Sequence, residues 1–489
     1  MPVLQGIPLP HDLVTLVLQL EGAGYKTYLV GGCMRDILFD VPPHDYDVVT
    51  QADPTTVKSL FSHTIDTGIK HGTVTVIMPD GQYEVTTMRK DGAYKDHRHP
   101  DTVEFVDDIT EDLARRDFTM NAIAGRILPD DDDSPEGTYT IGIIDPFNGY
   151  MDLSGGFIKC VGDPNKRFQE DPLRILRALR FTVSYDLSID DKAERAIHAN
   201  IQMLNGLSAE RVQSELRKMF IAGQENHKAM VYLLLYYPDV WRELIPELEL
   251  GVDFDQHSPY HTHTVYDHII QSVIKLHDAA QRLPEFAAAI HTHWFELCMT
   301  MLLHDIAKPV CYTVDESGTG HFYGHAEKSA ELADIILRRL KFSNEERERI
   351  VLLIQNHDRQ FEPTVRCTNR LLAGLGPVNA QLLMAVRFAD LYAHGVDYAQ
   401  FGTMNALRKA EITYLYLAIA IFEGRKLTIQ DLHINGHDLM EMGYRPGPLF
   451  GQCFNQLLQC VVDGKFQNDP YLLRRNAELF MQGHNAPLL

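Results

Sequence analysis

The pattern of apolar and polar positions changes about a third of the way along the chain. Before residue 165, short apolar runs separated by turn residues predict strands, as in "KTYLVGG" (26–32) and "YDVVT" (46–50). The stretch "GTVTVIMPDGQYEVTTM" (72–88) predicts a hairpin, because Pro-Asp-Gly suits a tight reversal. Ahead of these, "HDLVTLVLQLEGAGY" (11–25) predicts an amphipathic helix that ends at glycine.

From about residue 166 onward, apolar residues recur at three- and four-residue spacing, which is the helical period. The clearest examples are "DPLRILRALRF", "AERVQSELRKMF", "EKSAELADIILRRLKF" and "NRLLAGL". The sequence therefore predicts an α+β protein, with a mixed sheet and helices first and an all-helical remainder. A chain of 489 residues is too long to fold around a single hydrophobic core. We therefore expect four parts: a head (1–165), a neck (166–230), a body (231–405) and a tail (406–489).

Composition and charge restrict the function. The net charge of −22 argues against a general nucleic-acid binder, since phosphate backbones reward clustered Lys and Arg, so any such site must be a local basic patch. Seven scattered cysteines without Cys-x-x-Cys argue against a disulfide frame or zinc ribbon. No apolar run approaches the roughly 20 residues that span a bilayer, and no signal peptide is recognisable. We expect a cytoplasmic protein without a membrane partner.

The stretch "YLVGGCMRDILFDVPPHDYDVVT" (28–50) suggests the first chemistry. A strand has period two, so Asp45 and Asp47 are predicted to share a face, and paired carboxylates suit Mg²⁺ that also holds substrate phosphates. Gly31 and Gly32 let the backbone approach a triphosphate where a short helix begins. Surface acids beside an ordinary turn are the alternative.

A third acid is expected beside this pair. Glu84 lies on the neighbouring predicted strand "QYEVTTMR" and is our candidate. A strand glutamate that pairs with Arg89 or Lys90 is the alternative.

Together these motifs carry a family resemblance. The 28–50 stretch resembles the nucleotidyltransferase superfamily to which DNA polymerase β belongs. "RRDFTMNA" (115–122), "DPFNGYMDL" (145–153), "RFQEDPLRILRALRF" (167–181) and "SAERVQSEL" (208–216) resemble class II CCA-adding tRNA nucleotidyltransferases and their poly(A) polymerase relatives. The resemblance implies a polymerase β-like head.

The resemblance also implies roles for the nucleotide-binding residues. It assigns Arg115 and Arg116 to the nucleotide sugar and phosphates, and Asp117 to the ribose 2′-hydroxyl. It makes Asp171 and Arg174 an amino-acid template for CTP and then ATP; their spacing predicts that they meet on one helix face, where a plain salt bridge is the alternative. The remaining nucleotide-binding candidates are Arg35, Asn121, Arg177 and Arg180.

The activity implied is addition of CCA to the 3′ end of tRNA from CTP and ATP, with Mg²⁺ as cofactor and release of pyrophosphate. Residues 89–105 resemble the loop associated with adding the final A. A poly(A) polymerase and a partial enzyme that adds only CC or only A remain alternatives. A phosphohydrolase with a non-transferring head is the alternative from another class.

The helical body holds a second set of metal-ligand types. Its order H…HD…H…H…D resembles the HD superfamily of metal-dependent phosphohydrolases, and imidazoles with carboxylates suit Mn, Fe, Co, Ni or Zn. Two ions bridged by Asp305 and a phosphatase or 2′,3′-cyclic phosphodiesterase activity are implied; histidines packed in a core are the alternative. The predicted ligands are His263, His304, Asp305, His325, His357 and Asp390.

The tail resembles the family segment that grips the tRNA elbow. Its basic residues could supply the local positive surface that the acidic chain requires, although solvated helix charges would look the same. The oligomeric state stays open. The residues concerned are Arg408, Lys409, Arg425, Lys426, Arg445, Arg474 and Arg475.

Overall fold

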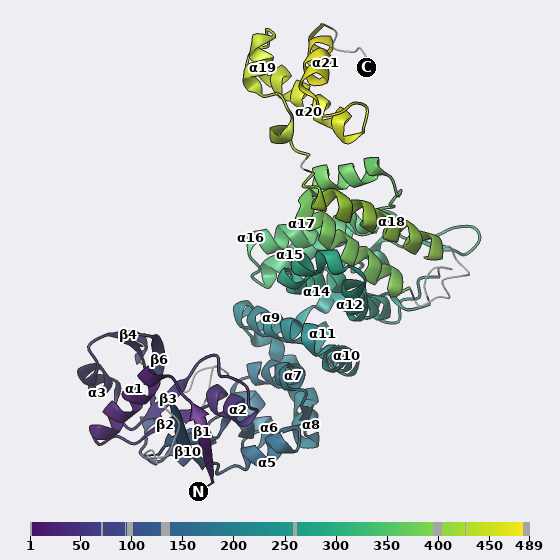
Figure 1. The fold of residues 1–489 in the computed structure, drawn as a ribbon. Coiled ribbons are helices and arrows are strands. Elements are labelled where there is room, and N and C mark those ends of the chain that lie inside the picture. The colour runs from purple at the N-terminus through teal and green to yellow at the C-terminus, as the bar shows by residue number, and fades with distance from the viewer. Residues whose placement is uncertain are drawn as a thin grey trace. The chain divides into compact units, whose positions relative to one another are not determined.

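The structure is a computed structural model that describes residues 2–69, 72–92, 94, 101–128, 137–257, 262–394, 403–425 and 427–482. Contacts between residues divide the chain into two compact units, Met1–Ala229 and Met230–Leu489 (Figure 1). The finer division into head, neck, body and tail stays a prediction.

The first unit contains an eight-stranded mixed sheet with the order β1-β10-β9-β2-β3-β6-β5-β4. β3 and β6 pair in parallel, whereas β5 and β6 form the antiparallel hairpin that the sequence predicts. The strands are β1 (Val3–Pro8), β2 (Thr27–Val30), β3 (Asp47–Thr50), β4 (Thr64–Gly68), β5 (Thr73–Met78), β6 (Gly81–Thr87), β9 (Ala124–Ile127) and β10 (Thr138–Ile144).

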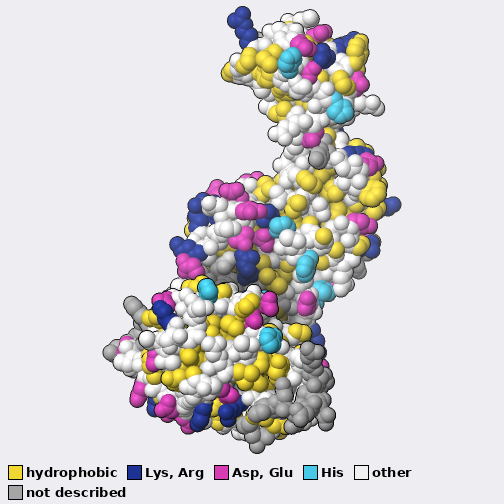
Figure 2. All heavy atoms as spheres, turned by 60° about the vertical axis from the view of Figure 1, so that its left-hand side comes forward, with side chains coloured by type: hydrophobic (Ala, Val, Ile, Leu, Met, Phe, Trp, Pro, Cys, Tyr) yellow, Lys and Arg dark blue, Asp and Glu magenta, His cyan; other side chains and the backbone are white. Residues whose placement is uncertain are grey.

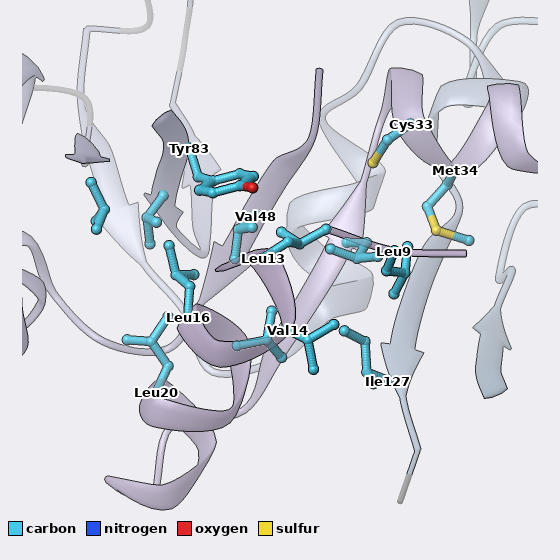
Figure 3. Close-up of a cluster of buried hydrophobic side chains, with 14 of the residues drawn as sticks. Leu9, Leu13, Val14, Leu16, Leu20, Cys33, Met34, Val48, Tyr83 and Ile127 are labelled. Atoms are coloured by element: carbon cyan, nitrogen blue, oxygen red, sulfur yellow. The ribbon is translucent and has the colours of Figure 1, made fainter. Parts of the chain in front are cut away.

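Alternation along β3 separates two apolar layers. Val48 packs with Leu13 and Leu16 of α1 (His11–Gly22), which covers one face of the sheet (Figure 3). Val49 points to the other face, where it packs in the cluster that contains residues of α4 (Ile109–Ala114). Because side chains alternate along a strand, Asp47 lies on the α4 side with Val49.

The remaining described helices of this unit include the two predicted by the spacing of apolar residues. Leu173, Leu176 and Leu179 of α7 are buried, as expected for its apolar face. The helices are α2 (Gly32–Leu38), α3 (Pro54–Leu60), α5 (Gly149–Ser154), α6 (Pro164–Glu170), α7 (Leu173–Tyr185), α8 (Asp191–Asn200) and α9 (Ala209–Glu225).

The second unit is almost entirely helical. α12 packs against α14 and α17, and α15 packs against α16. Its helices are α11 (Pro238–Leu244), α12 (Val265–Arg282), α13 (Ala287–Thr292), α14 (Trp294–Leu303), α15 (His325–Arg339), α16 (Asn344–Asn356), α17 (Val365–Tyr392), α18 (Thr403–Phe422), α19 (Gly436–Glu441), α20 (Pro448–Val462) and α21 (Pro470–Gln482); α10 (His227–Tyr236) crosses the boundary between the units. The predicted α+β class is confirmed.

Among the described residues, α17 alone is long and apolar enough to cross a membrane. However, Gly376 has φ 74° and Pro377 follows it, so the helix is broken near its middle. More than half of its apolar window is buried within the second unit. These features are those of a core helix.

On the face drawn in Figure 2, acidic and basic side chains lie interspersed.

Candidate functional site

A pocket of about 780 Å³ in the first unit is lined by every catalytic and nucleotide-binding residue that the sequence predicts for the head and the neck. Carboxylates and guanidinium groups dominate its wall, which makes it the local concentration of arginine that an acidic nucleotide-binding protein needs. The predicted residues in the wall are Gly31, Gly32, Arg35, Asp45, Asp47, Glu84, Arg115, Arg116, Asp117, Asn121, Asp171, Arg174, Arg177 and Arg180.

Three carboxylates gather at the start of β3. Asp47 opens the strand and lies in parallel register with Glu84 of β6, so both side chains project from the same face. Asp45 lies in the bend just before the strand. Burial, together with the neighbouring Asp45 and Glu84, raises the pKa of Asp47 although Arg116 opposes the shift. This oxygen-rich site favours a divalent cation that would relieve the repulsion.

Glycine is required at the turn that faces these carboxylates. Gly31 has φ 73°, a conformation that side-chain-bearing residues rarely adopt. A Cβ at this position would lie 3.0 Å from Nη1 of Arg116 and 3.2 Å from Oδ2 of Asp47. The missing side chain therefore keeps the space between the acids and the arginine open.

Asp117 organises one wall of the pocket. It accepts hydrogen bonds from Nε of Arg177 (2.7 Å) and Nδ2 of Asn121 (3.0 Å), and Asn121 in turn accepts one from Arg35 (2.8 Å). Burial works to raise the pKa of Asp117, but Arg177 and Asn121 hold it well below its ordinary value. Asp117 therefore remains an acceptor, which fits a hydroxyl donor such as a ribose.

The two adjacent arginines share one anchor. Nη2 of Arg115 donates to Oδ1 of Asp112 (2.7 Å), and Nη2 of Arg116 donates to Oδ2 of the same carboxylate (3.3 Å). Asp112 is fully buried at the end of α4. This bidentate support directs both guanidinium groups into the pocket.

The expected pairing of Asp171 with Arg174 on one helix face is wrong. Asp171 is extended (φ −148°) and ends α6, while α7 begins only at Leu173. The cause is Pro172, because the residue before proline is driven away from helical geometry. Asp171 instead accepts a hydrogen bond from Arg211 (2.6 Å), although Asp171 and Arg174 still line the same pocket.

Arg174 has a different partner. Its Nη1 donates to Oε2 of Glu170 (2.7 Å), the last residue of α6. The two template candidates are thus held apart by separate ion pairs, and each presents its own polar edge to the pocket.

Sequence reasoning missed several lining residues. Arg89, Tyr94 and Arg211 also lie in the wall, and the hydroxyl of Tyr94 donates to Asp91 (2.7 Å). Arg211 belongs to the quoted motif "SAERVQSEL", which could have indicated it. Of the 89–105 loop, residues 93 and 95–100 lie outside the described residues.

A second group of ligand-type side chains lies in the helical unit. Asp305 joins two clusters, because Oδ2 lies 3.2 Å from Nε2 of His268 and Oδ1 lies 3.3 Å from Nε2 of His325. The first cluster consists of His268, His304, Asp305 and Asp390, and the second of Asp305, His325 and His357. Nε2 of His357 lies 3.4 Å from Oδ1 of Asp305. All the members of the two clusters are buried.

The protonation of the imidazoles fits a cation. Nδ1 of each of the four cluster histidines contacts a backbone carbonyl, which can only accept, so each Nδ1 carries the hydrogen and each Nε2 faces inward. Both oxygens of Asp305 are buried without a hydrogen bond of ordinary geometry. Convergent imidazole nitrogens around such a carboxylate fit one or two transition-metal ions.

The electrostatics agree with this assignment. Burial lowers the pKa of His304, but Asp305 and Asp390 outweigh it and raise the value to about 10. Without metal, the cluster therefore retains a proton that a bound cation would replace.

The prediction of His263 as a ligand is wrong. His263 precedes the helix, and its carbonyl accepts a hydrogen bond from Gln256 (3.1 Å). The side chain of Thr264 caps α12, which places His268 one turn into the helix on its buried face. The ligand candidate that the structure supports is thus the last histidine of "HTHTVYDH", and the helix-start signal could have identified it.

Around the second cluster lies a cavity of about 920 Å³. Nζ of Lys308 is 2.7 Å from Oδ2 of Asp305, and Nη1 of Arg387 is 3.0 Å from Oδ2 of Asp390. His394, a further residue that the sequence reasoning missed, lies 3.7 Å from Asp390. Cationic groups therefore accompany the ligands, as a phosphate-binding site requires.

Several predicted basic residues of the tail are paired with acids. Lys409 pairs with Glu362, Arg425 with Glu423, and Arg474 with Asp438. Lys426 lies outside the described residues. Their contact with tRNA stays a prediction.

The head fold and its carboxylate–arginine pocket are of the poly(A) polymerase head type. Residues 27–159 match the family "Poly A polymerase head domain", residues 186–249 match "Probable RNA and SrmB-binding site of polymerase A", and residues 322–477 match "tRNA nucleotidyltransferase domain 2 putative".

A more particular assignment comes from whole-length relatives. The chain is 31% identical to the CCA-adding enzyme of Limosilactobacillus fermentum (strain NBRC 3956 / LMG 18251) over 94% of its own length and 95% of that protein. The chain belongs to the CCA-adding enzyme family. It is also 45% identical to the Lactobacillus helveticus (strain DPC 4571) CCA-adding enzyme, over 44% of its own length. The alignments with the first such relatives span about half of each relative's length.

Solved structures agree on the fold. The Bacillus stearothermophilus CCA-adding enzyme in complex with CTP is 27% identical, with a TM-score of 0.61 over 96% of this chain and 98% of that one. The Thermotoga maritima CCA-adding enzyme complexed with tRNA_CCA is 17% identical, with a TM-score of 0.57 over 98% and 100% of the chains, and supports the fold alone. The predicted resemblance to CCA-adding enzymes and poly(A) polymerases is confirmed. The predicted resemblance of the helical body to the HD superfamily stays a prediction.

Proposed function

We propose that the protein adds CCA to the 3′ end of tRNA from CTP and ATP and releases pyrophosphate. The observation that carries the proposal is the single pocket that joins Asp45, Asp47 and Glu84 to the predicted nucleotide-binding arginines. The carboxylates would hold Mg²⁺, and the arginines would bind the triphosphate and the base. The proposed location is the cytoplasm.

The chain's own groups would perform most of the work. Bound Mg²⁺ supplies positive charge that activates the tRNA 3′-hydroxyl and offsets charge on the pyrophosphate. Arg115 and Arg116, held by Asp112, would orient the phosphates for in-line attack. Asp117 would accept the ribose 2′-hydroxyl and so favour ribonucleotides.

Selection of the base would depend on two separately anchored groups. Asp171, held by Arg211, offers acceptors, whereas Arg174, held by Glu170, offers donors. Cytosine and adenine each present an amino donor beside a ring-nitrogen acceptor, whereas uracil and guanine present a carbonyl acceptor beside a ring N–H donor. A fixed acceptor from Asp171 and a fixed donor from Arg174 can therefore favour cytosine and adenine. This complementarity favours CCA addition over a poly(A) polymerase.

Extension of a tRNA that lacks its 3′ CCA tests the proposal. CTP alone should add two residues, ATP alone none, and both together three. Termination after CC, or addition of A only to a tRNA ending in CC, would identify a partial enzyme. Runs of A from ATP alone would identify a poly(A) polymerase. Absence of any incorporation would support the alternative of a phosphohydrolase with a non-transferring head.

We propose a second activity, hydrolysis of phosphate monoesters or 2′,3′-cyclic phosphates, in the helical unit. The observation that favours it is Asp305 between two imidazole clusters, with Lys308 beside it. A metal bound there would supply a hydroxide nucleophile. Metal analysis of protein purified after supplementation with Mn, Fe, Co, Ni or Zn tests this proposal, and a content well below one ion per chain would contradict it.

A further inference from the structure

An exposed aromatic pair lies on the rim of the metal-cluster cavity. The side chain of Tyr323 is 78% exposed, and its ring stacks on that of His321 with centroids 5.3 Å apart and planes 11° apart. His321 is itself held, because its Nε2 lies 2.7 Å from Oδ2 of Asp315 in the β13–β14 hairpin (Thr313–Val314 and Gly320–His321). A flat ring with one supported face therefore presents its other face outward.

The chain ties this ring to the clusters. Gly324 turns the backbone with φ 74°, and α15 then begins with the ligand candidate His325. Tyr323 lies two residues before His325, so their Cα atoms are at most about 7 Å apart. Both residues line the same cavity with Asp305 and His357.

The cavity is lined by cationic groups beside the clusters and by an exposed aromatic ring. Lys308 is buried beside Asp305, and its Nζ also lies 5.5 Å from the ring of Phe322. Arg387 is buried beside Asp390. The charged part suits a phosphate, whereas the exposed tyrosine at the rim suits a flat, weakly polar group.

We propose that Tyr323, supported by His321, stacks the base of a nucleotide whose phosphate lies at the Asp305 clusters. The inference rests on the proposed phosphohydrolase activity and names its substrate class: a nucleotide or the terminal nucleotide of an RNA, and not a base-free phosphate ester. Aromatic stacking tolerates any base, so this subsite would recognise a nucleotide without reading its sequence.

Binding measured without turnover tests the inference. The full chain, loaded with metal, is titrated calorimetrically with an analogue of adenosine 3′-phosphate in which carbon replaces the bridging oxygen, and with methylphosphonate as the base-free ligand. The variants are Tyr323→Ala and Tyr323→Phe. Tyr471→Ala removes a similarly exposed ring of α21 and is the matched control.

Tyr323→Ala should weaken binding of the nucleotide analogue about fivefold to a hundredfold, leave methylphosphonate unchanged and retain the metal. Tyr323→Phe and Tyr471→Ala should bind like the wild type. Equal affinity of Tyr323→Ala and wild type for the analogue, or equal losses for both ligands, would overturn the inference. A wild-type protein that binds no metal would instead contradict the proposed hydrolase.

Discussion

The two candidate sites are each centred on an aspartate in opposite electrostatic surroundings. Asp47 is buried beside Asp45 and Glu84, and its pKa is raised. Asp305 is also buried, but His304 and Lys308 hold its pKa well below the ordinary value. The head therefore needs the positive charge of a divalent cation, whereas the helical site is built around imidazole nitrogens that would hold a metal as ligands. This contrast indicates two separate chemistries in one chain.

The largest effect is expected from Asp47→Asn. This change keeps the side-chain shape but removes a metal-binding charge, and metal-centred stabilisation is worth several kcal/mol. Incorporation of labelled CTP should fall at least about a hundredfold, while the metal content of the helical unit stays unchanged. Asp66→Asn, at an exposed ion pair outside the pocket, is the control. CTP incorporation within a few fold of wild type would contradict the assignment of Asp47 as a metal ligand.

The reciprocal change is Asp305→Asn. Because Asp305 is shared by both imidazole clusters, its loss should remove the bound transition metal and any hydrolysis of 2′,3′-cyclic nucleotides. CCA addition should stay within about twofold of wild type, because the two sites share no ligand. Elemental analysis and tRNA extension on the same sample measure both, with Asp278→Asn as an exposed control. Loss of both activities would contradict the independence of the head site and the helical site.

A smaller, selective effect is expected in base choice. Arg174→Ala or Asp171→Ala removes one edge of the proposed template, and a lost hydrogen-bond partner costs about 1–3 kcal/mol. Discrimination against UTP and GTP should fall about fivefold to 150-fold, with a lesser change in triphosphate affinity. Arg195→Ala, exposed on α8, is the control. Unchanged discrimination in both template variants would contradict the assignment.

The smallest effect concerns stability. Since the folded-state pKa of Asp47 is raised, its contribution to stability is fully present below pH 3.8 and is lost as the pH rises through the folded value. At pH 7 without metal, Asp47→Asn should therefore slightly increase the free energy of unfolding. Mg²⁺ should stabilise the wild type more at pH 7 than at pH 4. Urea unfolding with and without Mg²⁺ measures both, and a destabilised metal-free variant would contradict the electrostatic account.

The head site was largely predictable because strand periodicity and sequence motifs determine its residues locally. Asp45, Asp47 and Glu84 follow from two adjacent strands, and the described geometry brings all three to one pocket. The error at Asp171 arose because one proline divides what reads as a continuous helix. Arg211 reaches the site through the packing of α9 on α7, so its motif could indicate the residue but not its contact with Asp171.

The helical site was less predictable, because its candidate ligands come from five separate helices and their ends. The order of ligand types was sufficient to find most of them. The choice between His263 and His268 depended on where α12 begins, and only His268 lies on the buried face of that helix. Tyr323 has no motif at all, and its position at the rim follows from the turn before α15.

The most direct test of two independent sites is tRNA extension by protein from which transition metals have been stripped and to which only Mg²⁺ is returned. The substrate is a tRNA that lacks its 3′ CCA, with CTP and ATP present, and the product length is read at nucleotide resolution. The account predicts full extension by three residues ending in CCA, with no measurable hydrolysis of 2′,3′-cyclic nucleotides by the same sample. Failure of extension until a transition metal is restored would contradict it.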